Sequence, residues 1–115
     1  MSGLRYKIFV APFPFGDLSA KKTRPVLCLT DIIGKYEELV VAYVTTKIPS
    51  PLLPTDILLT SNDRDFKQTK LLFDSTIRLH KLLTLPKDII IGALGELSSR
   101  RIEDVEKKLA LLFQI

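Results

Sequence analysis

Cysteine, histidine and tryptophan are almost missing from this sequence, which has one Cys, one His and no Trp. A single cysteine excludes an intrachain disulfide and a cysteine-based metal site, as is typical of proteins of the reducing cytosol. No apolar run reaches the roughly 18 residues of a membrane span, and the first ten residues lack the long apolar segment of a signal peptide. We therefore expect a cytoplasmic protein that does not contact a membrane.

The chain is short, apolar and mildly basic. Its 115 residues suffice for one domain with a real core, and 46% of them are hydrophobic, with a mean hydropathy of +0.20. A small domain with so much apolar surface must cover it internally or against another subunit, which indicates oligomerisation. The 17 Lys and Arg residues exceed the 13 Asp and Glu residues, and this net charge of +4 favours anionic partners such as nucleic acid or an acidic protein.

Alternating hydrophobicity predicts a series of short strands. The expected strands lie at 6–11, 25–30, 39–44, 55–60, 70–81, 82–85 and 89–94. The segments 25–30 and 39–44 are too close together for a parallel crossover, so they should form an antiparallel hairpin. Three prolines make 46–55 a surface loop, and 13–23 is a long loop of a kind that is often functional.

The last segment predicts an amphipathic helix that begins after Leu97, with Ser98 or Ser99 as its N-cap. Its apolar residues recur at helical spacing: Ile102, Val105, Leu109, Leu112 and Phe113. Antiparallel strands followed by one helix indicate a mainly β fold with a C-terminal helix, built as a compact small antiparallel barrel.

Arg24 is the first candidate for a functional residue. It ends a basic loop, Lys21-Lys22-Thr23, and precedes Pro25 and an apolar strand. Pro25 fixes its own φ and biases Arg24 toward an extended conformation, so the guanidinium should project from a stiff strand entrance. The alternative is a solvated arginine before an edge strand.

The polar face of the segment 70–81 is the second candidate. By alternation, the core face holds Leu71, Phe73, Ile77 and Leu79, and the polar face holds Asp74, Thr76, Arg78 and His80. With Arg24 and Thr45 these side chains make a plausible phosphodiester site. A surface salt bridge between Asp74 and Arg78 is the alternative. Because the sequence lacks a Gly-rich phosphate loop, zinc-ligand spacing and a nucleophile elbow, a mechanism without metal or another cofactor is preferred.

Several short motifs resemble one known family in their order and spacing. They are Thr23-Arg24-Pro25 with Val26 to Leu29 and Asp31, then Val44-Thr45-Thr46, Ile77-Arg78, and Leu97-Ser98 at the start of the helix. Together they resemble the MazF/PemK/Kid ribosome-independent endoribonuclease toxins of bacterial toxin–antitoxin modules. The resemblance implies a single PemK/MazF-like domain over 1–115, with the SH3-like barrel that this family shares with the gyrase poison CcdB.

The resemblance also implies site residues and partners. Arg24 and Thr45 match the catalytic pair: the arginine would act in proton transfer and charge stabilisation, and the threonine would hold the scissile phosphate. Lys21 and Lys22 lie in the loop that lines the RNA groove in this family. Together with the polar face of 70–81, the expected RNA-binding residues are Lys21, Lys22, Thr23, Thr46, Asp74, Thr76, Arg78 and His80. The implied partners are single-stranded RNA, an acidic antitoxin and a second copy in a homodimer. Operator DNA would be bound only by the toxin–antitoxin complex.

The expected reaction is metal-independent cleavage of mRNA by attack of the ribose 2′-OH on the adjacent phosphate. Two alternatives remain at this point. One is a non-enzymatic toxin that traps gyrase as CcdB does, although that action relies on an aromatic C-terminal tail and this chain ends Phe113-Gln114-Ile115. The other is a nucleic-acid-binding barrel that has lost catalysis. Cleavage of naked RNA by the purified protein separates the first reading from both alternatives.

Overall fold

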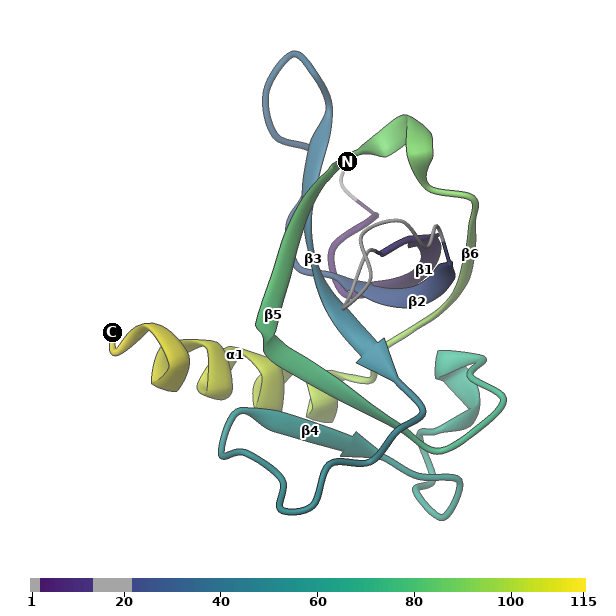
Figure 1. Ribbon diagram of the computed structural model, residues 1–115, viewed down its shortest axis with the longest axis vertical. Helices are drawn as coiled ribbons and strands as arrows, with labels where there is room; N and C mark the ends of the chain where they lie inside the picture. The colour runs from purple at the N-terminus through teal and green to yellow at the C-terminus, as the bar shows by residue number, and fades with distance from the viewer. Residues whose placement is uncertain (1–2, 14–21) are drawn as a thin grey trace.

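The computed structural model describes residues 3–13 and 22–115. In these residues, strands are followed by one helix (Figure 1). The strands are β1 (Lys7–Pro12), β2 (Thr23–Cys28), β3 (Glu38–Thr45), β4 (Asp56–Leu59), β5 (Ser75–Pro86) and β6 (Gly92–Glu96); the 3₁₀ helices are η1 (Lys67–Thr69) and η2 (Lys87–Ile89), and the α-helix is α1 (Ser99–Phe113). The expected mainly β chain with a C-terminal helix is confirmed.

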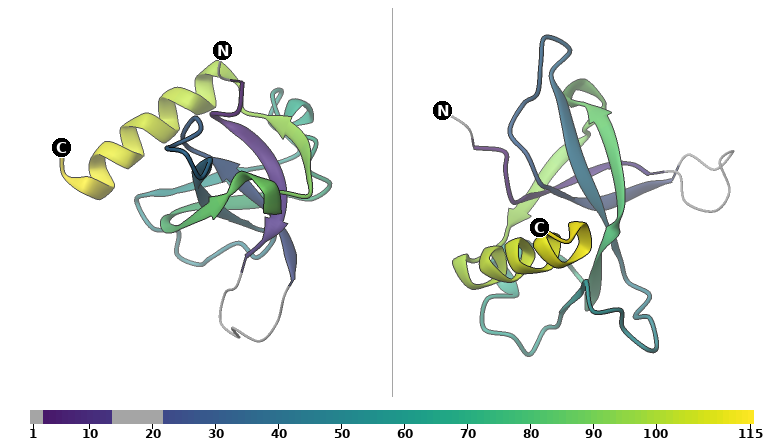
Figure 2. Two further views of the ribbon diagram at one scale, coloured as in Figure 1. Left: turned by 90° about the horizontal axis from the view of Figure 1, so that it is seen from above. Right: turned by 90° about the vertical axis from the view of Figure 1, so that its left-hand side faces the viewer.

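All the strands pair antiparallel in one sheet, in the order β4-β5-β3-β2-β1-β6. β2 and β3 form the expected hairpin, with Val26 opposite Tyr43. β1 and β6 pair as well, although Lys7 and its partner Glu96 come from the two ends of the chain. The sheet curls into a half-barrel, and α1 lies against one side of it (Figures 1 and 2).

A break in the strand register bends β5. Tyr43 of β3 faces Arg78, whereas the preceding residue of β3, Ala42, faces Leu82. The β5 residues between these two pairs, 79 to 81, therefore have no partner of their own in β3, and β5 turns sharply along its length (Figure 1). The first half of β5 also pairs with β4, while the second half lies beside the first half of β3.

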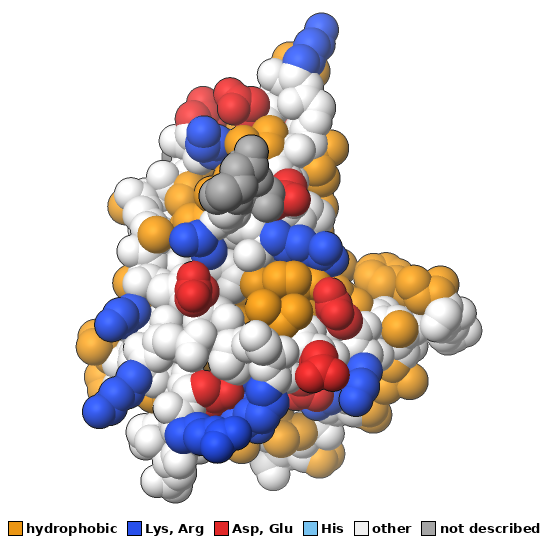
Figure 3. Space-filling model, turned by 180° about the vertical axis from the view of Figure 1, so that it is seen from behind, with side chains coloured by type: hydrophobic (Ala, Val, Ile, Leu, Met, Phe, Trp, Pro, Cys, Tyr) orange, Lys and Arg blue, Asp and Glu red, His pale blue; other side chains and the backbone are white. Residues whose placement is uncertain are grey.

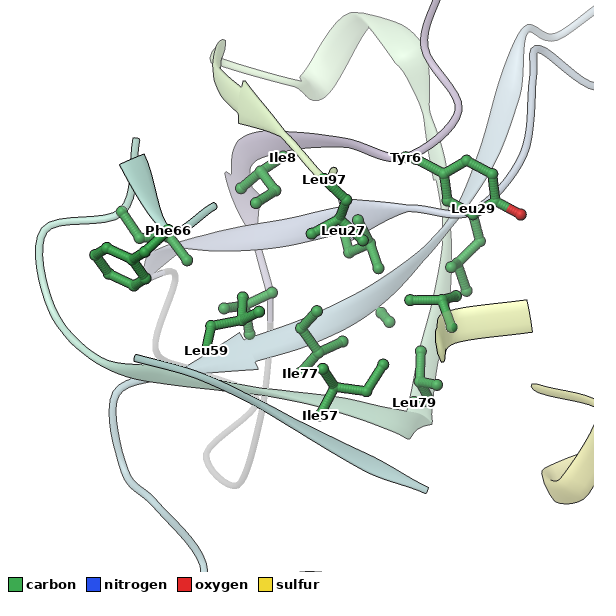
Figure 4. Close-up of a cluster of buried hydrophobic side chains, with 14 residues drawn as sticks. Tyr6, Ile8, Leu27, Leu29, Ile57, Leu59, Phe66, Ile77, Leu79 and Leu97 are labelled. Atoms are coloured by element: carbon green, nitrogen blue, oxygen red, sulfur yellow. The ribbon is translucent and has the colours of Figure 1, made fainter. Parts of the chain in front are cut away.

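Two hydrophobic clusters lie on opposite faces of the curled sheet. The first lies between the sheet and α1 and includes Leu27 and Ile77 (Figure 4). The second lies on the other face and includes Phe9, Val26 and Val41. Val26 and Leu27 are neighbours in β2 but belong to different clusters, which explains why the central strands are apolar on both faces.

The N-terminus of α1 is fixed to the turn before η1. Ser98 is the N-cap, as expected: its Oγ accepts from the backbone N–H of Arg101 at 3.2 Å and donates to Asp65 at 2.6 Å. Arg100 pairs with Asp65 at 3.0 Å, and Arg101 pairs with Asp63 at 2.6 Å. These contacts hold the start of the helix against the body of the protein.

The C-terminal end of α1 projects beyond the sheet. Val105, near the middle of the helix, is fully buried, but Leu111 and Phe113 are each 56% exposed. Phe113, the last residue of the expected apolar stripe, therefore lies outside the core, because the sheet does not extend under the last turn. Hydrophobic side chains gather on this projecting end when the molecule is seen from behind (Figure 3). In the described part of the chain, no helix is long and apolar enough to cross a membrane.

The strand expected at 70–81 is shifted. It begins at Ser75 and runs to Pro86, so the strand expected at 82–85 is its second half. Residues before Ser75 form a turn, where Lys70 has a positive φ of 60° and Phe73 is 67% exposed, so Phe73 is wrong as a core residue. The last strand, expected at 89–94, is β6 at Gly92–Glu96, because η2 occupies Lys87–Ile89.

Candidate nucleic-acid interface

A pocket of about 540 Å³ lies where β2, β3 and β5 come together with the loop that follows β3. Its lining residues are Arg24 of β2, Tyr43 and Thr45 of β3, Arg78 and Lys81 of β5, and Lys47, Ile48 and Pro49 of the loop. Four of these eight residues are Lys or Arg, and no described lining residue is acidic. The pocket therefore suits an anion.

Strand pairing explains why residues so far apart in the sequence meet here. Tyr43 lies opposite Val26 of β2 on one side and opposite Arg78 of β5 on the other. Continuing the β2–β3 register by two residues brings Arg24 opposite Thr45. Residues that are directly opposite in a sheet share a face, so Arg24, Thr45 and Arg78 lie on one side of it.

Arg24 is held by the aromatic side chain of Tyr43. Its Nη1 donates a hydrogen bond to the Tyr43 hydroxyl at 3.2 Å, and the guanidinium carbon lies 5.6 Å from the centroid of the same ring. Its Nε is buried and has no hydrogen-bond partner among the described residues. Pro25 follows in the strand, so the backbone of Arg24 is extended, as expected.

Thr45 is the last residue of β3 and is buried at the base of the pocket. Its Oγ1 accepts a hydrogen bond from the backbone N–H of Lys47 at 3.1 Å. This bond fixes the oxygen and leaves the hydroxyl hydrogen for another acceptor, since a hydroxyl both accepts and donates. Thr45 can therefore donate to an anion bound in the pocket.

Arg78 is held by a buried carboxylate. Its Nε donates to Asp56 Oδ1 at 3.0 Å, and the Asp56 side chain is fully buried. The other oxygen of Asp56 accepts from the backbone N–H of Leu53 at 2.8 Å. Arg78 is therefore both a wall of the pocket and the counter-ion of a buried acid, which sequence reasoning did not expect.

The remaining walls add charge and apolar surface. The Lys81 ammonium lies 5.7 Å from the centroid of the Tyr43 ring, which thus contacts two cations. Lys47, Ile48 and Pro49 come from the loop expected at 46–55, and Ile48 is 48% exposed. A charged group with an apolar edge, such as a nucleotide, matches this combination of cationic and apolar walls.

The structure brings only some of the residues expected in the site together. Arg24, Thr45 and Arg78 line the pocket, whereas Lys22, Thr23 and Thr46 are exposed and do not line it; Asp74, Thr76 and His80 also lie outside the lining. Lys21 lies outside the described residues. The catalytic and RNA-binding roles of these side chains stay predictions.

The polar face expected for 70–81 is wrong in two respects. Thr76 is fully buried and not part of an exposed polar face. Asp74 does not pair with Arg78; its Oδ1 accepts from the backbone N–H of Ser61 at 2.7 Å. His80 is exposed. The partial desolvation of its imidazole and the positive charge of Arg78 nevertheless lower its pKa from the usual value. The surface-pair alternative for Asp74 is therefore also wrong.

Sequence reasoning missed Tyr43, Lys47 and Lys81. The first two carry a signal, because they stand two residues before and after Thr45, and alternate residues of a strand share a face. Lys81 carries none, because it reaches the pocket only through the break in register that bends β5.

The fold and the pocket define a small half-barrel protein with a cationic pocket. Residues 4–113 match the family model of PemK-like, MazF-like toxins of type II toxin-antitoxin systems. The chain therefore belongs to this toxin family, and the resemblance found in the sequence is confirmed. A comparison with curated proteins gives no match.

Solved structures share the fold over their whole length. A mycobacterial endoribonuclease in complex with its cognate antitoxin superposes with a TM-score of 0.73 and 18% identity, covering 99% of this chain and 97% of that chain. The Mycobacterium tuberculosis toxin MazF-mt6 gives 0.72 and 20%, covering 95% and 97%, and MazF of Deinococcus radiodurans gives 0.71 and 16%, covering 100% and 99%. The expected small-barrel fold of this family is thus confirmed.

Proposed function

We propose that this protein is an endoribonuclease toxin that cleaves single-stranded RNA, mRNA in particular, in the pocket formed by Arg24, Thr45 and Arg78. The observation that carries the proposal is that these three side chains, from three different strands, line one pocket without a described acidic wall. The mycobacterial structure with the same fold is an endoribonuclease, which supports the same reaction class. Cleavage of naked RNA separates this proposal from the gyrase-binding and catalytically inactive alternatives.

The proposed reaction uses the substrate's own nucleophile. The ribose 2′ oxygen bonds to the adjacent phosphorus and the bond from phosphorus to the 5′ oxygen breaks. The 2′-OH loses a proton and the 5′ oxygen gains one, so the products carry a 2′,3′-cyclic phosphate and a 5′-hydroxyl. This intramolecular attack needs no metal to activate water, because the nucleophile is already next to the phosphorus.

Arg24 and Thr45 have separate parts in this proposal. The guanidinium of Arg24 offsets the negative charge that develops on the phosphoryl oxygens, because it donates hydrogen bonds to them and keeps its positive charge. The Thr45 hydroxyl, with its oxygen fixed by the Lys47 N–H, donates to the same phosphate. Losing one such donor typically costs about 2.7–4 kcal/mol of transition-state stabilisation.

The neighbouring cations extend the site along the RNA backbone. Arg78, Lys47 and Lys81 would contact the phosphates that flank the scissile one. Each phosphate contact contributes to affinity in a salt-dependent way, with a slope of roughly 0.7 per contact for single strands. The two lysines are new members of the proposed RNA site, and Asp74 and Thr76 are dropped from it because of the contacts and burial described above.

We also propose an acidic antitoxin as the protein's inhibitor and a homodimer as its active form. Solved structures of related folds include complexes with an antitoxin, and an acidic segment complements the cations near Lys22 and Arg24. Leu52 and Leu53, each 41% exposed, are apolar surface that a second copy could cover. Light scattering at micromolar concentration tests the dimer. Affinity for antitoxin that survives a Lys22→Glu change in a Lys21→Glu background would refute this placement of the antitoxin.

The deciding experiment is cleavage of a naked RNA oligonucleotide by purified protein. We expect cutting in EDTA as well as without it, no cutting of DNA, and no cutting where the scissile ribose is replaced by a single 2′-deoxy residue. Arg24→Ala should lower kcat by roughly 10²- to 10³-fold, and Thr45→Ala by a similar or smaller factor. Arg64→Ala, an exposed arginine outside the pocket, is the matched control. Cutting at the 2′-deoxy position, or cutting abolished by EDTA, would overturn the mechanism.

A further inference from the structure

The aromatic ring at the centre of the pocket, Tyr43, touches two of its cations. We propose that Tyr43 is a positioning residue that holds the Arg24 guanidinium in the orientation needed for the phosphate. This inference rests on the proposed function for its chemistry, but its geometric content can be tested without any reaction. Its spacing from Thr45 places Tyr43 on the pocket face of β3, but its contact with Arg24 is created only by the fold.

Tyr43 is itself rigid. Its side chain is only 8% exposed and belongs to the second hydrophobic cluster. The ring packs against Phe13, with centroids 5.4 Å apart and an interplanar angle of 34°. Its backbone is held in β3 between Val26 and Arg78. A hydroxyl on such a ring has a fixed position, so a partner bound to it is fixed as well.

The hydrogen bond to Tyr43 occupies only one nitrogen of the Arg24 guanidinium. Nη1 of Arg24 donates to the Tyr43 hydroxyl at 3.2 Å, and the buried Nε makes no hydrogen bond within residues 3–13 and 22–115. Burying a donor without an acceptor costs free energy, and this cost is removed when an acceptor binds to the donor. With Nη1 occupied by the phenol, the edge formed by Nε and Nη2 remains for a phosphate, which arginine prefers to bind with two parallel hydrogen bonds.

The same ring also contacts two like charges. The Arg24 guanidinium lies 5.6 Å and the Lys81 ammonium 5.7 Å from the ring centroid. Attraction of each cation to the ring offsets part of their mutual repulsion before RNA is bound. Tyr43 thus keeps Arg24 in place while the pocket is empty, which is the condition for electrostatic preorganisation.

The test uses Tyr43→Phe, which removes the hydroxyl and keeps the ring in the core. We expect kcat for RNA cleavage to fall roughly tenfold with KM changed less than about twofold, since a hydrogen bond to a charged group is lost from positioning and not from binding. Tyr36→Phe is the matched control, because Tyr36 is 72% exposed on the β2–β3 turn. In an Arg24→Ala background, Tyr43→Phe should have no further effect, because a residue that acts only through Arg24 has nothing left to position. An equal loss of kcat in that background would overturn the inference in favour of a merely structural role.

A second measurement keeps the two proposals apart. Restricted rotation of the Arg24 guanidinium can be followed by ¹⁵N NMR of its side chain, with the signal assigned by its loss in Arg24→Lys. We expect slow rotation in the wild type and in Tyr36→Phe, and fast rotation in Tyr43→Phe. An Arg24 signal unaffected by Tyr43→Phe would overturn the inference even if RNA is cut. If the wild type shows the restricted rotation but does not cleave RNA, the proposed function is refuted and the inference about Tyr43 stands.

Discussion

Replacing Arg78 with alanine should destabilise the whole protein as well as weaken its pocket. The Asp56 carboxylate is fully buried and has one charged partner, Arg78, at 3.0 Å. Removing one partner of a buried ion pair costs about 3–5 kcal/mol, because the remaining charge stays buried and uncompensated. Since the Arg78 side chain keeps 18% of its surface exposed and Asp56 retains the Leu53 N–H, we expect the lower end, about 3 kcal/mol. At about 4 °C per kcal/mol for a domain of this size, Tm should fall by about 12 °C.

The measurement is urea unfolding followed by circular dichroism at pH 7, with Arg64→Ala as the control. Arg64 is exposed, so its replacement should change the free energy of unfolding by no more than about 0.5 kcal/mol. The double variant Asp56→Asn/Arg78→Ala removes the buried charge together with its partner and should recover at least half of the lost stability. If Arg78→Ala is as stable as Arg64→Ala, or the double variant is no better than the single one, the buried-pair argument is refuted.

The remaining predictions concern Gly95, the acidic anchor of α1 and His80. Gly95→Ala should lower the free energy of unfolding in urea by about 1–3 kcal/mol, because a Cβ there would clash with the backbone of Gln68 and Thr69 in η1, whereas Gly92→Ala, which meets open space, should change it little. A hydrogen bond from Ser98 holds the pKa of Asp65 below its ordinary value of 3.8, so this stabilisation is present above that pH and is lost as pH falls further. The urea concentration at the unfolding midpoint, measured from pH 7 to pH 3, should therefore decrease below about pH 4. The decrease should be less steep in Asp65→Asn. His80→Gln should leave RNA cleavage within about twofold of wild type, since the imidazole lies outside the pocket lining; a tenfold loss would contradict the pocket as described.

Local signals in the sequence were enough for most of the fold. The β2–β3 hairpin follows from two apolar runs with a short connection, and α1 follows from its apolar stripe and the Ser98 cap. The errors fall where neighbouring strands decide the environment of a residue. Thr76 was expected on a polar face, but hydrophobic clusters lie on both faces of the sheet, so alternation alone could not sort the residues of β5.

The pocket was predictable only in part, for a similar reason. Arg24 and Thr45 were found because a proline and a strand end mark their places, and motif order added Arg78. Asp56 was missed as the partner of Arg78, because that contact depends on the pairing of β4 with β5, which no short-range pattern specifies. Lys81 depends on the local disruption of one strand, and such irregularities leave no periodic signal.

The pairing of β1 with β6 has a consequence for how the chain matures on the ribosome. All the lining residues of the pocket lie between positions 24 and 81, yet the outer partner of β1 is Gly92–Glu96, and the helix that covers the first cluster follows at Ser99–Phe113. Contacts of such high sequence separation form late. A nascent chain therefore carries every proposed catalytic group well before the last strand and the helix, which complete the fold, have been synthesised. During this interval the nascent chain has all the residues of the pocket but has not finished folding. Its apolar surface is then exposed to any partner that binds first.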